Sequence, residues 1–352
     1  MALQEPVTKN ILIDLSKIEF LKAGYSLWED SGKSQAFDYI AVEDSNLHIS
    51  PTPNKIITKN IVDFDSFKKQ VSIQLLLISK LISGIPLLIG LYSSGKEISD
   101  LTLYRRHNIS AISLETLRKL LQSKEGSKLT KISKFAHRGG IFVNISQDLL
   151  KERRKRLHLE MSIISNLTGI SRHTLYRYEK GESFPKIESF ILLSEILGED
   201  LDVPIQIFEV RAENIPQETL NNYKLPRSKL QKEVSDYLAD KEFSVLWFKS
   251  EPFDGLSEPN MEENLNIREK NSFPILTGVA TPDKSINSVR IQTIESLSKF
   301  LKKKAFWFTE DENISDNTSI EDLSFKILHI SDLESMAPEE FFKLIKSGKI
   351  KK

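Results

Sequence analysis

Residues 143–201 read VNISQDLLKERRKRLHLEMSIISNLTGISRHTLYRYEKGESFPKIESFILLSEILGEDL, and this stretch decides the fold of the central part of the chain. Ser146 is placed to cap a first helix, and Gly169 is placed to end a second one. Ser171 caps a third helix that ends at Gly181, so a tight turn separates the second and third helices. This order and spacing predict a helix-turn-helix, followed by a fourth helix.

The predicted third helix, residues 171–180, has two chemically different faces. At 100° per residue, five polar and aromatic side chains fall within about 140° of one another. They are Arg172, His173, Tyr176, Arg177 and Lys180. Leu175 and Tyr178 fall on the opposite side, where they can pack against the other helices. A helix with one dense basic face fits the major groove of DNA, and arginine offers a bidentate donor pair to guanine.

The formal net charge of zero conceals a strong segregation of charge along the chain. Residues 1–115 carry 12 Lys and Arg against 13 Asp and Glu, residues 116–186 carry 16 against 6, and residues 187–352 carry 21 against 30. A basic block of this kind is typical of a segment that binds a polyanion. The competing interpretation is a solvated amphipathic helix in a helical bundle. The turn spacing, the polar face and the charge together favour DNA.

Base contacts are therefore predicted for Arg172, His173, Tyr176 and Arg177. Phosphate and positioning contacts are predicted from the third helix, the first helix and a preceding basic arm. These residues are Ser171, Thr174, Lys180, Arg153, Lys155, Arg156, Lys186, Lys128, Lys131, Lys134 and Arg138.

The same stretch resembles the phage-repressor-like XRE class of helix-turn-helix domains over residues 145–200. The resemblance rests on Leu150 and Arg154, on Leu159-Glu160-Met161, on the run GISRHTLYRYEKG at 169–181, and on Pro185. It implies a structural ion pair between Arg154 and Glu179, so neither is assigned to DNA reading. Many members begin the second helix with a glutamine that touches DNA, whereas this chain has Met161.

The layout of the whole chain resembles an archaeal family of HTH-type transcriptional regulatory proteins. Both have an α/β segment of about 120 residues, a linker, a short strand at 141–145, the helix-turn-helix and a C-terminal α/β tail. The resemblance implies a sequence-specific regulator of transcription that binds double-stranded DNA. A homodimer is expected, because one such motif contacts few base pairs. An effector of unknown chemistry is left open.

The N-terminal segment is predicted to be a degenerate restriction-endonuclease-like α/β domain. Its expected elements are a helix at 13–23, strands at 37–42 and 47–49, a helix at 65–83, strands at 85–91 and 109–112, and a helix at 114–122. Asp38 stands where a metal-binding carboxylate could, but a nuclease also needs an acid and a lysine on the next strand. That strand, read as residues 47–51, has neither. We therefore expect no enzyme, and a nuclease targeted by the helix-turn-helix stays as an alternative.

The C-terminal part alternates strands and helices. A helix at 228–239, a strand at 243–248 and an acidic loop at 251–264 precede a small open α/β domain. Its expected elements are a strand at 273–279, a helix at 288–302, a strand at 305–309, an acidic loop at 310–317, a strand at 324–330 and a helix at 338–347.

The fold class is thus α/β plus all-α, in five predicted parts. They are an N-terminal α/β domain (1–122), a basic linker (123–140), a helix-turn-helix domain of four or five helices (141–204), a connecting segment (205–270) and a C-terminal α/β domain (271–352).

Several classes of protein are excluded by composition. The chain has no cysteine and its six histidines are isolated, so we predict no disulfide, metal site or cofactor. The apolar run 71–92 contains Gln74, Lys80 and Pro86, which argues against a membrane span. The N-terminus lacks a signal pattern, and we expect a cytoplasmic protein. A scaffold that binds RNA without sequence specificity remains a third interpretation.

Overall fold

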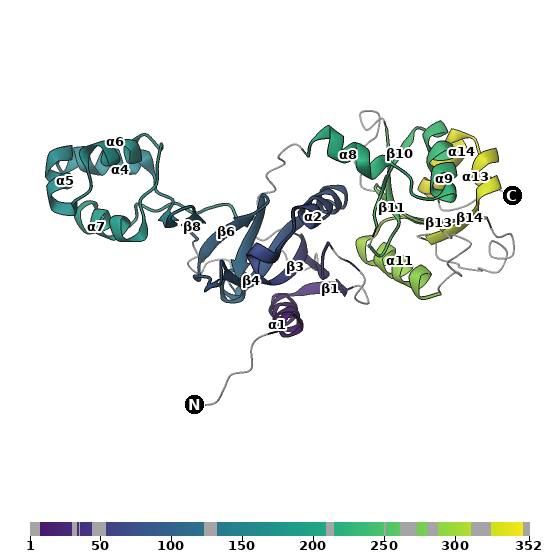
Figure 1. The fold of residues 1–352 in the computed structure, drawn as a ribbon, viewed down its shortest axis with the longest axis horizontal. Helices are drawn as coiled ribbons and strands as arrows, with labels where there is room; N and C mark the ends of the chain where they lie inside the picture. The colour runs from purple at the N-terminus through teal and green to yellow at the C-terminus, as the bar shows by residue number, and fades with distance from the viewer. Residues whose placement is uncertain are drawn as a thin grey trace, which may run out of the picture. The chain divides into compact units, whose positions relative to one another are not determined.

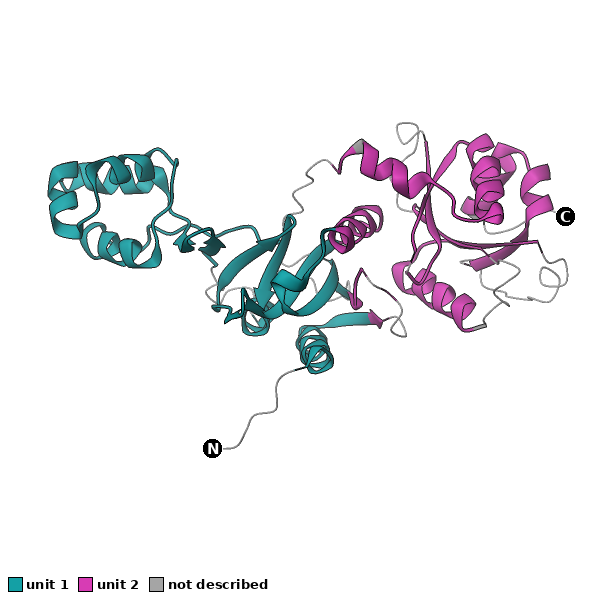
Figure 2. Cartoon of the chain, in the orientation of Figure 1, with its two compact units in different colours: residues 1–27, 41–69, 85–211 teal, residues 28–40, 70–84, 212–352 magenta. Residues whose placement is uncertain are grey.

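The computed structural model (Figure 1) describes residues 8–29, 34, 36–43, 54–122, 132–208, 215–249, 251–260, 273–279, 288–310 and 325–347. The chain divides into two compact units (Figure 2). The first comprises residues 1–27, 41–69 and 85–211, and the second comprises residues 28–40, 70–84 and 212–352. The predicted combination of α/β parts with an all-helical part is confirmed.

The first sheet contains nine strands of the described chain. In chain order they are β1 (Tyr25–Glu29), β2 (Tyr39–Glu43), β3 (Lys55–Asp63), β4 (Ile85–Ser93), β5 (Lys96–Glu97), β6 (Thr102–Arg106), β7 (Ile109–Ser113), β8 (Lys134–His137) and β9 (Gly140–Val143). Their order in the sheet is β1-β2-β3-β4-β7-β6-β8-β9, with β5 paired to β4. Strands β3, β4 and β7 are parallel, and Leu87, Leu88 and Ile89 of β4 are fully buried, as in the interior of a parallel sheet.

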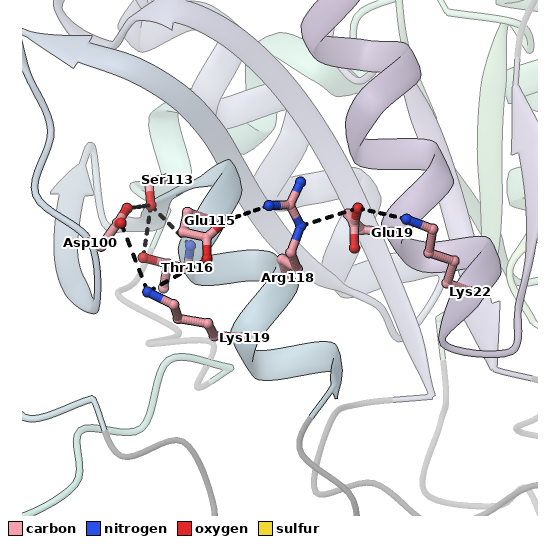
Figure 3. A network of polar contacts seen from close by, with 8 residues as sticks. All are labelled: Glu19, Lys22, Asp100, Ser113, Glu115, Thr116, Arg118 and Lys119. Atoms are coloured by element: carbon pink, nitrogen blue, oxygen red, sulfur yellow. Dashed lines mark hydrogen bonds and ion pairs between the residues drawn. The ribbon is translucent and has the colours of Figure 1, made fainter.

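Helices α1 (Lys9–Lys22) and α3 (Leu114–Gln122) pack on this sheet, and helix α2 (Lys69–Leu81) lies between β3 and β4 in the chain. A polar network joins α1 to α3 (Figure 3). The buried carboxylate of Glu19 accepts from Arg118 Nε at 3.3 Å and from Lys22 Nζ at 3.3 Å. Arg118 also holds Glu115, with 2.6 Å between Nη1 and Oε2. The network therefore leaves Glu19 with two cationic partners, which offsets the cost of burying its charge.

The structure differs from the expected elements of this region at several places. The helix expected at 65–83 begins only at Lys69, because residues 64–66 form a separate 3-10 turn whose Asp65 N–H is capped by the side chain of Asp63. Strands β1, β3, β5 and β6 were not predicted, and the strand expected at 47–49 lies outside the described residues. Strand β8 falls inside the segment predicted as a linker.

The second sheet has the order β10-β11-β12-β13-β14. Its strands are β10 (Phe243–Trp247), β11 (Gly255–Pro259), β12 (Ile275–Val279), β13 (Ala305–Thr309) and β14 (Phe325–His329). The first three are antiparallel and the last three are parallel. The helices of this part are α8 (Gln217–Lys224), α9 (Lys229–Asp240), α11 (Ser288–Leu301), α13 (Ile330–Ser335) and α14 (Pro338–Ser347).

This sheet begins earlier than expected, within the segment predicted as a connection. Strand β11 was predicted as part of an acidic loop, yet it pairs with both β10 and β12. At Gly255 an added Cβ would lie 2.8 Å from a methyl group of Val245, so the close approach of β10 requires glycine there. Most of the acidic loop expected at 310–317 lies outside the described residues.

No helix in the described ranges is both long enough and apolar enough to cross a membrane.

Candidate nucleic-acid interface

The four helices of the central part are α4 (Gln147–Arg156), α5 (Met161–Thr168), α6 (Arg172–Glu179) and α7 (Ile187–Leu197). Their ends follow from local chemistry. The Ser146 hydroxyl accepts from the N–H of Leu149 at 3.2 Å, and the Ser171 hydroxyl accepts from that of Thr174 at 3.1 Å. Gly169 ends α5 with φ of 69°, a left-handed conformation that favours glycine. The turn between α5 and α6 is therefore fixed by its own residues.

One face of α6 is held in the core of this helical part. Leu175 and Tyr178 are 3% and 6% exposed and pack in a cluster with Leu150, Ile164 and Leu193. Burial raises the pKa of the Tyr178 phenol. Because this face is fixed, the opposite face of α6 must point away from the other helices.

The outward face of α6 carries the residues predicted to read bases. Arg172, His173, Tyr176 and Arg177 are all exposed, and Tyr176 is 52% exposed although it is aromatic. The ammonium of Lys180 lies 5.5 Å from the centroid of that ring, a cation–π distance. The structure thus brings all four side chains together on one solvent-facing surface, which we call the α6 face.

Arg177 has a partner within the protein. Its Nη2 donates to the carbonyl of Glu182 at 3.3 Å, and its Nε lies 3.7 Å from the Glu182 carboxylate. Both side chains are about half exposed, and an ion pair of this kind contributes at most about 1 kcal/mol. Glu182 therefore orients Arg177 through a weak, solvent-exposed contact, which a bidentate acceptor such as the O6 and N7 edge of guanine can displace.

Arg154 and Glu179 form a bidentate ion pair. Nε and Nη2 of Arg154 donate to Oε1 and Oε2 of Glu179 at 2.6 and 3.1 Å. The hydrogen bond to Glu179 raises the pKa of Arg154. Both side chains are turned toward each other, so neither contributes to the α6 face.

The residues predicted to touch phosphates lie in several settings. Lys155, Arg156 and Lys186 are exposed, whereas Arg153 is half-buried and donates from Nη1 to the carbonyl of Leu197 at 3.1 Å. Arg138 is exposed in the turn between β8 and β9, and Lys134 lies on β8. Lys128 and Lys131 lie outside the described residues.

Comparison with known proteins bears directly on this geometry. Residues 150–203 match the helix-turn-helix family. The chain contains an XRE-type helix-turn-helix domain. The resemblance predicted from the residues of α4–α7 is confirmed.

Archaeal relatives match most of the chain and carry the provisional name HTH-type transcriptional regulatory protein. The relative from Pyrococcus furiosus is 28% identical over 82% of this chain and 83% of its own length. The relative from Methanocaldococcus jannaschii is 28% identical over 82% and 81%, and one from Methanococcus maripaludis is 25% identical over 80% and 83%. No solved structure gives a significant match to the chain.

The N-terminal part also has a match: residues 9–127 match a PD-(D/E)XK superfamily domain. This match confirms the predicted nuclease-like fold. Among the described residues, the strand that follows β2 is β3, and it carries Lys59.

The described residues of this domain do not fit the metal site that the name of the superfamily implies. A motif of acid, any residue and lysine places both side chains on one face of a strand. Two residues before Lys59 stands Ile57, which is fully buried. On the other face of β3, Thr58 stands at the position of the acid and Asn60 at the position of the lysine. Asn60 Oδ1 accepts a hydrogen bond from Ser16 Oγ at 2.9 Å. Sequence reasoning missed Lys59 because it predicted no strand at residues 55–63.

Asp38, the carboxylate proposed from the sequence, is half-buried directly before β2. Glu19 on α1 is engaged by Arg118 and Lys22. Across the described ranges, no group of three or more His, Asp or Glu side chains is arranged to hold a metal ion. We therefore derive no catalytic step through a metal for this domain.

Proposed function

We propose that this protein is a sequence-specific double-stranded DNA-binding regulator of transcription, in which α6 enters the major groove. The observation that carries the proposal is the α6 face, where four exposed residues able to contact bases are presented by a helix whose other face is buried. Arginine side chains on such a face form bidentate contacts with guanine, and exposed Tyr176 offers a flat apolar surface and a hydroxyl. The names of the archaeal relatives support the assignment to transcription.

The proposed complex has two copies of the chain on one operator. A single α6 spans only a few base pairs, so two half-sites extend the sequence that is read and multiply the affinity. Arg156, Lys155 and Lys186 then supply contacts with phosphates that set the position of the helix but do not read sequence.

The N-terminal domain, in this proposal, is a nuclease fold without nuclease activity. The match to the superfamily favours the alternative of a targeted nuclease, but Ile57 and the engaged Glu19 argue against it.

The test is selection from genomic DNA. Purified protein is incubated with sheared DNA of its source organism at about 150 mM salt, which suppresses binding through phosphates alone, and retained fragments are sequenced. We expect a short inverted repeat near promoters. The double variant Arg172→Ala/Arg177→Ala should lose this enrichment, whereas the control Lys224→Ala, on α8, should retain it. Retention of fragments with no shared motif, or preference for RNA at equal salt, would overturn the proposal.

A further inference from the structure

A pocket of about 860 Å3 lies in the first unit, beside the β8–β9 hairpin. Its walls come from the end of β4, from β6, from β8 with the turn after it, and from the loops that flank α4–α7. This volume is in the range of sites that enclose a small organic molecule. None of the residues predicted from the sequence to read bases lines it.

The place of the pocket follows from the pairing of β6 with β8. Both strands can be followed in Figure 1. The register pairs Thr102 with Lys134 and Leu103 with Phe135. The pocket is lined by this last pair and by the residues that follow it, up to Arg106 on β6 and to Arg138 after β8. The pocket thus lies where the paired part of the two strands ends.

The lining is cationic. It includes Arg105, Arg106 and Arg138, and none of the lining residues that the structure describes is Asp or Glu. Arg106 is anchored by contacts with Asp65 and with Ser93 Oγ. Arg138 is exposed and has no hydrogen bond or ion pair to any residue that the structure describes. The net positive charge around the cavity favours an anionic ligand, and a guanidinium suits the oxygens of phosphate.

The other chemical feature of the lining is aromatic. Phe135 and Phe184 meet edge to face, with 5.2 Å between ring centroids, and Tyr104 also lines the cavity. Phe135 and Phe184 are partly exposed, so their rings are available to a ligand. Aromatic walls favour a flat, apolar ring system.

We infer that this pocket binds a free nucleotide, with its phosphates at Arg138 and Arg105 and its base against Phe135 and Phe184. Guanidinium groups and aromatic rings in one concave site favour a nucleotide over a simple anion, because a simple anion would leave the aromatic rings without a contact. They also favour a nucleotide over duplex DNA, in which the bases are stacked within the helix and only the backbone phosphates are offered to a pocket.

The position of Phe184 connects the pocket to the helix-turn-helix. Phe184 lies in the loop between α6 and α7, and the next residue, Pro185, accepts from the N–H of Val143 at 2.9 Å. A ligand that contacts Phe184 therefore touches the loop that follows the recognition helix. This consequence rests on the proposed function: bound nucleotide changes the affinity for the operator, and bound operator changes the affinity for the nucleotide by the same factor.

The first experiment omits DNA, so that its result does not depend on the proposed function. The full-length protein is titrated calorimetrically with ATP, GTP, CTP and UTP, and separately with adenosine and with inorganic pyrophosphate. We expect saturable binding of at least one nucleotide, with pyrophosphate and adenosine each at least about tenfold weaker, because each lacks half of the contacts.

Two variants and a matched control locate the binding site. Arg138→Gln should weaken nucleotide binding by about tenfold or more, and Phe184→Leu should weaken it while keeping the loop apolar. Lys224→Gln removes an exposed cation that lies outside the pocket and outside the proposed DNA interface, and it should leave nucleotide binding unchanged. Circular dichroism melts establish that each variant is folded.

Two outcomes would overturn the inference. One is the absence of binding by all four nucleotides, and the other is nucleotide binding that Arg138→Gln leaves intact. If Arg138→Gln abolishes binding of a short random duplex, while no nucleotide binds to the parent protein, the pocket is instead a contact site for the DNA backbone. Loss of the operator motif in genomic selection with nucleotide binding preserved would instead remove the proposed function and leave this site.

Discussion

Arg154 on α4 and Glu179 on α6 face each other through two hydrogen bonds, and the Nη1 of the same arginine donates to the carbonyl of Leu159 at 3.2 Å. One guanidinium thus ties α6 to α4 and to the loop that leads into α5. The side chains of Arg154 and Glu179 are only 18% and 9% exposed, so water competes weakly for these bonds. The ion pair fixes the angle at which the α6 face is presented.

Removing either partner should loosen α6. Arg154→Ala leaves the Glu179 carboxylate in a largely buried position without its cation, and we expect a loss of about 2–3 kcal/mol in local stability. Hydrogen exchange of the α6 amides measures this loss directly. Arg156→Ala, on the same helix but exposed, should change it little. If the double variant Arg154→Met/Glu179→Met is no more stable than Arg154→Ala, the unpaired charge is not the cause.

Gly169→Ala isolates the cost of the tight turn. An added Cβ at Gly169 would meet no atom within 4 Å, so the substitution introduces no clash. The left-handed φ of 69° remains, and we expect a loss of about 1 kcal/mol from backbone strain alone. Gly169→Asn should cost less, because asparagine tolerates this conformation better. Thermal melts followed by circular dichroism compare the two, and equal losses would contradict this explanation.

Arg172 and Arg156 should affect DNA binding in different ways. Arg172→Ala should cost about 1–3 kcal/mol on the selected operator and relax the preference at one base pair. Arg156→Ala should weaken binding to all sequences alike and lower the slope of affinity against salt by about one ion. Fluorescence anisotropy on operator and random duplexes at several salt concentrations measures both. Equal losses on the two duplexes for both variants would refute this division of roles.

The nuclease-like domain should not cleave DNA. We expect supercoiled plasmid to remain intact in the presence of Mg²⁺ or Mn²⁺, because Ile57 occupies the position two residues before Lys59 where an acid is needed. Gel electrophoresis over several hours provides the measurement. Nicking that depends on Mg²⁺ and disappears in Asp38→Ala would establish the alternative of a targeted nuclease.

Asp65 should make part of the stability depend on pH. The hydrogen bond from Ser94 and the charge of Arg106 hold the pKa of this carboxyl below its usual value. Its contribution is therefore complete above the unfolded pKa of about 3.9 and is lost as the pH falls through the lower, folded value. Asp65→Asn should lower the melting temperature at pH 7, and the difference from the parent protein should close below about pH 4. A constant difference between pH 7 and pH 3 would contradict this assignment.

The helix-turn-helix could be predicted from the sequence because its boundaries are set by residues within one or two turns. Ser146, Gly169 and Ser171 act on neighbouring backbone groups, and the structure places each at the helix end expected. The face of α6 follows from helical periodicity alone. Neither inference required knowledge of distant contacts.

The missed strands depend on partners that are distant in sequence. Strand β11 reads GLSEP and is stabilised by β10 and β12, including the 2.6 Å contact between the hydroxyls of Ser257 and Thr277. Strand β8 lies in a basic run and pairs with β6, some thirty residues earlier. Composition favours a loop in both cases, and only the tertiary pairing makes them strands. The pocket depends on the same pairing, so no local residue pattern indicated it.

The hairpin of β8 and β9 also determines which fragment of the chain contains the complete core of the helix-turn-helix. Val143 at the end of β9 and Ile145 after it belong to the same buried cluster as Leu150 and Leu175, although the helix-turn-helix match begins at residue 150. The N–H of Ser146 likewise donates to the carbonyl of Leu201 at 2.9 Å. A fragment trimmed to the matched residues would expose part of its own interior, whereas one that spans residues 132–208 keeps the cluster whole. The packed cluster around these helices thus extends beyond the motif by which they are recognised.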